Sequence, residues 1–214
     1  YVMSEEPELV KKAHVDFIEA GATVITLNTY STTPERLEAN DLSDKFSFFH
    51  KKAIDLARAA IDQTQKDVLI AGCLPPLVWS YRPDKAPDYE RCVELYLQIV
   101  REQENFVDLF ICETMASIKE AKAAVMAAKT SGKTIWCGLT LEDNENCELR
   151  SGEKLIDCVN ELQSLGQQEI VLNCSFPEVI DKGMAILSQN SKFFGGYGNG
   201  FTSIEPLKTA SNVS

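Results

Sequence analysis

Short apolar runs alternate with longer amphipathic segments along the whole chain. The apolar runs are rich in β-branched residues and predict six strands. These strands cover residues 23–27, 68–73, 107–112, 134–140, 169–172 and 192–199. Between them, apolar residues recur every three or four positions, which predicts helices. Five helices cover residues 46–61, 89–104, 117–130, 153–165 and 178–187, and an earlier one runs from an N-cap at Ser4 to Gly21, with Val10, Ala13, Phe17 and Ile18 facing inward.

The predicted strands are apolar along nearly their whole length, so we expect them to be parallel and buried on both faces. Two architectures have such strands, the (β/α)8 barrel and the doubly wound open sheet. No strand is followed by a GxGxxG or GxxxxGK[ST] phosphate-binding motif. Polar residues follow several of the strands, whereas a doubly wound sheet would have its binding residues at one switch point. We therefore predict an α/β chain of the (β/α)8 TIM-barrel class, with one domain over residues 1–214. The glycine-rich run 195–200 is interpreted as a tight turn at a strand end.

Charge and cysteine content narrow the class of partner. The 214 residues carry a net charge of −11, which argues against nucleic acid and anionic membranes, because both require a clustered basic surface. The longest apolar run, 68–74, is too short to cross a bilayer, and the first residues do not resemble a signal peptide. Seven cysteines, an odd number, fit a reducing compartment. We expect a cytoplasmic protein with a small-molecule partner and find no pattern that specifies an oligomeric state.

Cys174 is the main candidate for chemistry, because it directly follows the predicted strand 169–172 and Asn173. In α/β barrels, the carboxyl ends of the strands carry the active site. The alternative is a buried cysteine that only packs, which is common, and no CxxC pair supports a zinc site. Cys147 lies in a polar loop. The remaining cysteines fall within predicted strands and helices and are interpreted as core residues: Cys73, Cys92, Cys112, Cys137 and Cys158.

Other polar residues also follow predicted strands. A carboxylate at Glu113 is suited to holding the ammonium group of an amino acid, although a solvated loop acid is the alternative. Asn28, Asn173 and Asn199 stand at comparable positions, where an asparagine alone more often serves a turn. His14 is interpreted as a structural histidine bonded to backbone, and His50 as a residue on a helix surface. A nucleophile activated by histidine therefore has no good candidate base.

Several motifs, in this order and spacing, closely resemble the homocysteine S-methyltransferase family. They are His14 to Ala22, Thr26-Leu27-Asn28-Thr29-Tyr30, Ala71-Gly72-Cys73-Leu74-Pro75-Pro76, Glu113-Thr114-Met115 and Asn173-Cys174. The resemblance covers nearly the whole chain. It implies a zinc-dependent barrel that transfers a methyl group to homocysteine and forms methionine.

The resemblance also implies roles for single residues. Cys174 matches the first zinc-binding cysteine, and Glu113 matches the acid that binds the amino group of homocysteine. Asn28, Thr114 and Asn173 would line the pocket. Tyr197-Gly198-Asn199 is similar to the family's Tyr-Pro-Asn turn, so Asn199 is a candidate fourth ligand of Zn²⁺ when substrate is absent. The expected methyl donor is a sulfonium such as S-methylmethionine.

The sequence departs from the family pattern at both ends. The family's Asp-Gly-Gly turn would precede Tyr1, and its Gly-Gly-Cys-Cys segment, which supplies two more zinc ligands, would follow Ser214. We therefore expect a fragment with about six of the eight strand–helix units of a closed barrel. The alternative is a degenerate barrel that binds an amino acid or a protein partner without catalysis.

Overall fold

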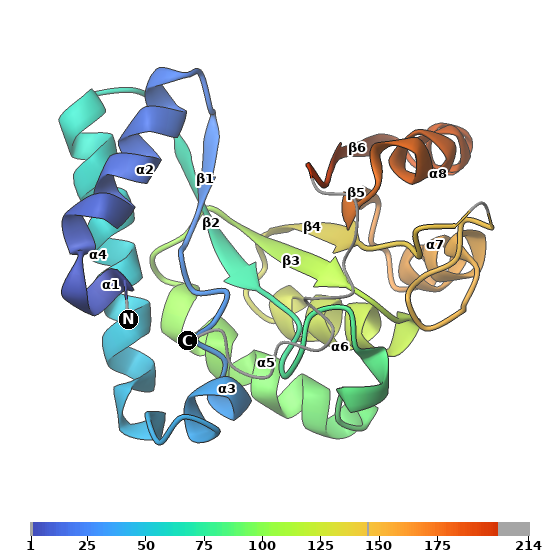
Figure 1. The fold of residues 1–214 in the computed structure, drawn as a ribbon, viewed down its shortest axis with the longest axis horizontal. Helices are drawn as coiled ribbons and strands as arrows, with labels where there is room; N and C mark the ends of the chain where they lie inside the picture. The colour runs from blue at the N-terminus through green and yellow to red at the C-terminus, as the bar shows by residue number, and fades with distance from the viewer. Residues whose placement is uncertain (1, 145, 201–214) are drawn as a thin grey trace.

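Six parallel strands form one curved sheet in the computed structural model, which describes residues 2–144 and 146–200 (Figure 1). The strands are β1 (Val24–Thr26), β2 (Leu69–Leu74), β3 (Leu109–Met115), β4 (Thr134–Leu139), β5 (Glu169–Ser175) and β6 (Phe193–Gly198). Each strand pairs with the next one in the sequence. A doubly wound sheet would reverse this order at a switch point. The strictly sequential order therefore confirms a partial barrel of the TIM type.

Helices lie on the outer side of the curved sheet, with α2 and α4 beside β1 and with α7 and α8 towards the opposite end (Figure 1). Their bounds are α1 (Val2–Glu5), α2 (Pro7–Glu19), α3 (Pro34–Glu38), α4 (Phe46–Thr64), α5 (Tyr89–Gln103), α6 (Ile118–Lys129), α7 (Leu155–Ser164) and α8 (Pro177–Asn190). Asp88 caps α5 by accepting a hydrogen bond from Arg91 N, and Ser117 caps α6 by accepting one from Glu120 N. Among the described residues, no helix has the length and apolar character that a membrane span requires.

The first helix differs from the prediction. It is interrupted before Pro7, which lacks an N–H and begins α2 as its first residue, so Ser4 lies within α1 and is not the N-cap of α2. Phe17 was expected to face inward, but it is 68% exposed. It lines a cavity of about 540 Å³ between α2 and β1, together with Leu9 and His14. The apolar stripe of α2 therefore packs only in part against the described residues.

Both histidines differ from their predicted environments. His50 is fully buried: its Nε2 lies 3.2 Å from the carbonyl oxygen of Thr32, and Nε2 of Gln103 lies 3.0 Å from its Nδ1. Burial lowers the pKa of His50 to about 4, so the ring is neutral at pH 7. His14 was expected to bond to backbone, but its buried Nε2 has no hydrogen-bond partner among the described residues. His50 lies on the inward-packing face of α4, where a polar group needs a specific partner, whereas His14 lines the cavity between α2 and β1.

Two strands extend through polar residues beyond the predicted apolar runs. β3 includes Glu113 and Thr114, and β5 includes Asn173 and Cys174, because backbone pairing resumes beyond these polar residues, at Met115 and Ser175. The run 195–200 was expected to be a turn, but Gly195 to Gly198 belong to β6 and pair with β5. Hydrogen bonds between backbones require no apolar side chain. Apolar runs alone therefore place the strand ends too early.

Gly196 permits the close approach of β6 to β5. A Cβ atom at this position would lie 2.6 Å from the carbonyl oxygen of Leu172, which is backbone and has little freedom to move. We expect Gly196→Ala to lower the free energy of unfolding by about 1–3 kcal/mol, as overpacking usually does. Gly195→Ala is the matched control, since its Cβ would meet nothing within 4 Å. Urea unfolding of both variants measures the difference, and equal stabilities would contradict the assigned pairing.

Candidate active site

The carboxyl ends of β3 and β5 share an unusual backbone geometry. Thr114 and Cys174 both have positive φ angles, 60° and 55°. The register shifts between Cys112 and Met115 in β3 and between Asn173 and Ser175 in β5. Left-handed backbone is unfavourable for residues with a side chain, above all for β-branched threonine, and such strain is concentrated at functional sites. The two distortions place Thr114 beside Cys174.

The sulfur of Cys174 accepts hydrogen bonds from two neighbouring side chains. Oγ1 of Thr114 donates to it at 3.5 Å and Nδ2 of Asn173 at 3.4 Å. Nδ2 of Asn173 also lies 3.0 Å from Oγ1 of Thr114 and 3.1 Å from the hydroxyl of Tyr197. Cys174 is half-buried, whereas Thr114 and Asn173 are buried. The sulfur is therefore held in a defined place and remains accessible.

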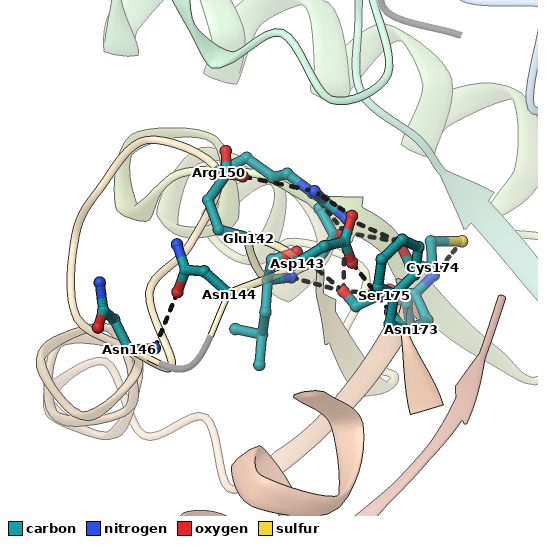
Figure 2. A network of polar contacts seen from close by, with 11 residues as sticks. Glu142, Asp143, Asn144, Asn146, Arg150, Asn173, Cys174 and Ser175 are labelled. Carbon is teal, nitrogen blue, oxygen red and sulfur yellow. Dashed lines mark hydrogen bonds and ion pairs between the residues drawn. The ribbon is translucent and has the colours of Figure 1, made fainter. Parts of the chain in front are cut away.

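The loop after β4 contacts the backbone around Cys174 (Figure 2). Nη2 of Arg150 donates to the carbonyl oxygen of Cys174 at 3.2 Å, and Asp143 accepts from the amide of Phe176 at 2.9 Å. The hydroxyl of Ser175 accepts from the amide of Leu141 at 2.8 Å. Sequence reasoning missed Arg150, because it lies in a polar loop without periodicity and its partners come from a different strand.

Three tyrosines lie near Cys174, and sequence reasoning did not select them as site residues. Burial raises the pKa of Tyr30 to about 12, and it also raises the pKa values of Tyr81 and Tyr197. The nearby Cys174 sulfur, which would carry a negative charge as a thiolate, contributes in the same direction for all three. All three phenols therefore stay protonated at neutral pH and are able to donate hydrogen bonds. Tyr30 and Tyr197 belonged to motifs noticed in the sequence, whereas Tyr81 did not.

Glu113 and Asn28 line the cavity of about 540 Å³ beside β1. The thiol of Cys73 lies 3.7 Å from Oε2 of Glu113 and donates to it. Burial raises the pKa of Glu113, because the low-dielectric surroundings disfavour the charged carboxylate. An ammonium group next to Glu113 would offset this cost. The cavity therefore suits the amino group of an amino acid.

Asn199 follows β6, and its backbone N–H donates to the carbonyl oxygen of Ser175 at 2.8 Å. Its Nδ2 is buried and has no hydrogen-bond partner among the described residues. The same holds for Oδ1 of Asn173, the residue next to Cys174. The structure thus brings Cys174, Asn173 and Thr114 into contact and places Glu113 and Asn28 on one cavity. Asn199 lies directly after β6, the strand that pairs with β5.

The site around Cys174 is chemically suited to zinc, since a cysteine sulfur is a preferred zinc ligand. Within residues 2–144 and 146–200, however, no group of three or more Cys, His, Asp or Glu side chains has the arrangement of a metal site. Cys73 is fully buried, and burial raises the pKa of its thiol well above the usual value, so it is a poor ligand. Cys92, Cys112, Cys137 and Cys158 are core residues, as expected. Of the described cysteines at the carboxyl ends of the strands, Cys174 is therefore the one suited to bind zinc.

Known proteins resemble this chain in both fold and sequence. The metallated form of the homocysteine methyltransferase MmuM from Escherichia coli superposes with a TM-score of 0.82 at 24% identity, over 97% of this chain and 77% of that chain. The homocysteine S-methyltransferase of E. coli K12 is 27% identical over 199 residues, which are 86% of this chain and 60% of the relative. Betaine–homocysteine S-methyltransferase 1 of Danio rerio is 28% identical over 183 residues, which are 81% of this chain and 42% of the relative.

The chain spans less than two thirds of the length of these curated relatives. The sequence model of the homocysteine S-methyltransferase family nevertheless matches residues 1–211, nearly the whole chain. Glu113 and Cys174, two residues of the motifs noticed in the sequence, lie at the carboxyl ends of β3 and β5. The chain belongs to the homocysteine S-methyltransferase family.

Proposed function

We propose that the protein to which this chain belongs transfers a methyl group from a sulfonium donor, such as S-methylmethionine, to the thiolate of homocysteine. The thiolate attacks the methyl carbon, the carbon–sulfur bond of the sulfonium breaks, and its electron pair stays on the departing thioether. Homocysteine becomes methionine, and the proton of its thiol passes to solvent. Membership of the family supports methyl transfer to homocysteine.

The observation that carries this proposal is the position of Cys174. Its accessible sulfur lies at the carboxyl end of β5, in contact with Thr114 and Asn173. Glu113 belongs to β3, which β4 separates from β5, and it lines the cavity beside β1. A homocysteine bound here would have its ammonium group at Glu113, by a charge-assisted hydrogen bond, and its sulfur towards Cys174. Asn28, Thr114 and Asn173 would line its path and fix its orientation.

Cys174 would be one ligand of a zinc ion, with the other ligands from residues outside those described and with Asn199 as a ligand in the absence of substrate. Bound zinc supplies one kind of chemistry, the deprotonation of a coordinated thiol. The chain's own residues bind and orient the substrate. The protonated phenols of Tyr30, Tyr81 and Tyr197 offer hydrogen bonds and ring faces near Cys174, and ring faces attract a cationic methyl donor.

We place the reaction in the cytoplasm. All seven cysteines are free, which fits a reducing compartment. The net charge of −11 favours small-molecule substrates over nucleic acid or anionic membranes.

The proposal is tested by incubating the natural gene product and zinc with homocysteine and either S-methylmethionine or betaine. With S-methylmethionine, we expect methionine to form both from homocysteine and from the donor. With betaine, we expect homocysteine to be converted to methionine more slowly or not at all. Mass spectrometry with an isotope-labelled methyl group follows the transfer. Efficient transfer from betaine alone would contradict the proposed donor. If homocysteine were unchanged with every donor, the result would favour a barrel that binds an amino acid without catalysis.

A further inference from the structure

We propose that Arg150 is a positioning residue for Cys174: it holds the cysteine backbone in the left-handed conformation that directs the sulfur towards the site. This inference rests on the proposed function, because it assigns Arg150 a part in zinc binding. Arg150 does not contact the sulfur itself. It acts through the carbonyl group of Cys174 and through the loop after β4.

The guanidinium group of Arg150 is almost completely buried, with a side-chain exposure of 1%. Nη2 donates to the carbonyl oxygen of Cys174 at 3.2 Å, and Nε donates to Oγ1 of Thr140 at 3.3 Å. The hydroxyl of Thr140 donates in turn to the same carbonyl oxygen at 3.1 Å. Two donors therefore converge on the backbone oxygen of Cys174, one from Arg150 and one from the threonine that Arg150 contacts. Figure 2 shows Arg150 reaching towards Cys174.

Asp143 completes the arrangement from the same loop. Its Oδ2 lies 2.8 Å from Nη1 of Arg150, and its Oδ1 accepts from the amide of Phe176 at 2.9 Å. The Arg150–Asp143 pair thus contacts the chain on both sides of Ser175, at the carbonyl of Cys174 and at the amide of Phe176. These two contacts restrict the rotation of the peptide groups that follow Cys174. The loop that carries the pair is closed by the backbone bridge between Leu141 and Leu149.

The backbone of Cys174 requires this restraint. At a φ of 55°, a residue with a side chain is in an unfavourable conformation, which persists only where the surroundings hold it. In that conformation the sulfur meets Thr114 and Asn173. If the carbonyl of Cys174 were released, the residue would relax towards an extended conformation and the sulfur would turn away from both partners.

Arginine suits this role better than lysine. Its planar group has five donors in a fixed fork, so it bonds to Asp143, Thr140 and Cys174 at once. Its guanidinium carbon also lies 5.0 Å from the ring centre of Tyr81, which fixes the plane of the group from one side. A lysine ammonium would keep the charge beside Asp143 but would not span the three acceptors.

The test compares Arg150→Met and Arg150→Lys with Gln167→Met in the natural gene product. Gln167 is the matched control, because it is also buried and donates to two backbone carbonyls, those of Ile135 in β4 and Glu169 in β5. These carbonyls lie near the amino ends of the two strands, whereas Cys174 lies near a carboxyl end. Zinc affinity is measured by competition with a chromophoric chelator. Hydrogen exchange of the peptide covering residues 173–178 is measured on the zinc-free protein, and thermal unfolding reports stability.

We expect Arg150→Met to weaken zinc binding roughly tenfold or more, the usual effect of losing a group that orients a metal ligand. We expect the zinc affinity of Arg150→Lys to lie between that of Arg150→Met and that of the wild type. If Arg150→Met does not fold, the comparison of Arg150→Lys with the wild type is the test. Exchange at 173–178 should be faster in both Arg150 variants. Gln167→Met should lower thermal stability without changing zinc affinity or this exchange.

Wild-type zinc affinity in a folded Arg150 variant would overturn the inference while the proposed function stands. A wild-type protein that binds no zinc would instead overturn the zinc-dependent function and the role of Arg150 in metal binding. In that case, if the Arg150 variants showed the wild-type rate of hydrogen exchange at 173–178, the proposal that Arg150 restrains the backbone of Cys174 would also be overturned.

Discussion

Replacing Cys174 with serine is expected to abolish zinc binding and methyl transfer to homocysteine. A serine hydroxyl is a far weaker zinc ligand than a thiolate. Loss of a group that only orients a ligand costs about 10- to 100-fold in metal affinity or activity, so loss of a ligand should cost more than about 100-fold. The measurements are zinc content per chain after dialysis and the rate of homocysteine-dependent methionine formation.

The matched control for this variant is Cys147→Ser. Cys147 is likewise half-buried, with a positive φ of 52°, but it lies in the loop after β4. We expect its replacement to leave zinc content and activity near the wild-type values. An active Cys174→Ser protein, or equal losses in both variants, would contradict the assignment of Cys174 as a ligand.

Replacing Glu113 with glutamine is expected to raise the KM for homocysteine about 10- to 100-fold, since a hydrogen bond to a charged group contributes about 1.5–3 kcal/mol. Glutamine keeps the size and shape of the side chain and removes the charge that would face the substrate ammonium. The control is Glu120→Gln, which alters another buried glutamate, at the first turn of α6. Steady-state kinetics with varied homocysteine should show the increase only for Glu113→Gln.

The pH dependence of KM provides a second test of Glu113. Only the ionised carboxylate attracts the ammonium group, and burial raises the pKa of this carboxyl from 4.5. As the pH falls through the raised pKa, the KM of the wild type should increase, whereas that of Glu113→Gln should not follow this titration. The stability effect has the opposite sign, because the fold favours protonated Glu113 and this contribution is lost as the pH rises through its folded pKa. The variant should therefore be at least as stable as the wild type at neutral pH, and a large loss of stability would indicate a structural role.

The periodicity of the chain predicted the fold well. Six apolar runs correspond to six parallel strands, and their sequential pairing distinguishes a barrel from an open, doubly wound sheet. The strand ends were less predictable, because backbone pairing resumes at Met115 and Ser175, beyond the polar residues Glu113, Thr114 and Cys174. The polar residues at those ends were nevertheless the ones selected as candidates for the site.

Residues whose role depends on distant partners were not predictable from local sequence. His50 lies on a helix face beside apolar neighbours, and its burial is possible because Gln103, 53 positions further along the chain, reaches its ring. Arg150 belongs to a loop, and its contact with Cys174 depends on how that loop folds over the end of β5. A helix stripe or an apolar run is a local pattern, whereas a buried polar contact joins segments that only the fold brings together.

Zinc content per chain tests the central claim, that Cys174 belongs to a zinc site that activates homocysteine. It should be measured on residues 1–214 and on the natural gene product, with any residues that the latter has beyond this sequence. We predict about one zinc per chain in the natural product, as expected for a site with cysteine ligands and one open position. The same measurement on Cys174→Ser should find none. A natural product that binds no zinc, or that retains it after the loss of Cys174, would contradict the account.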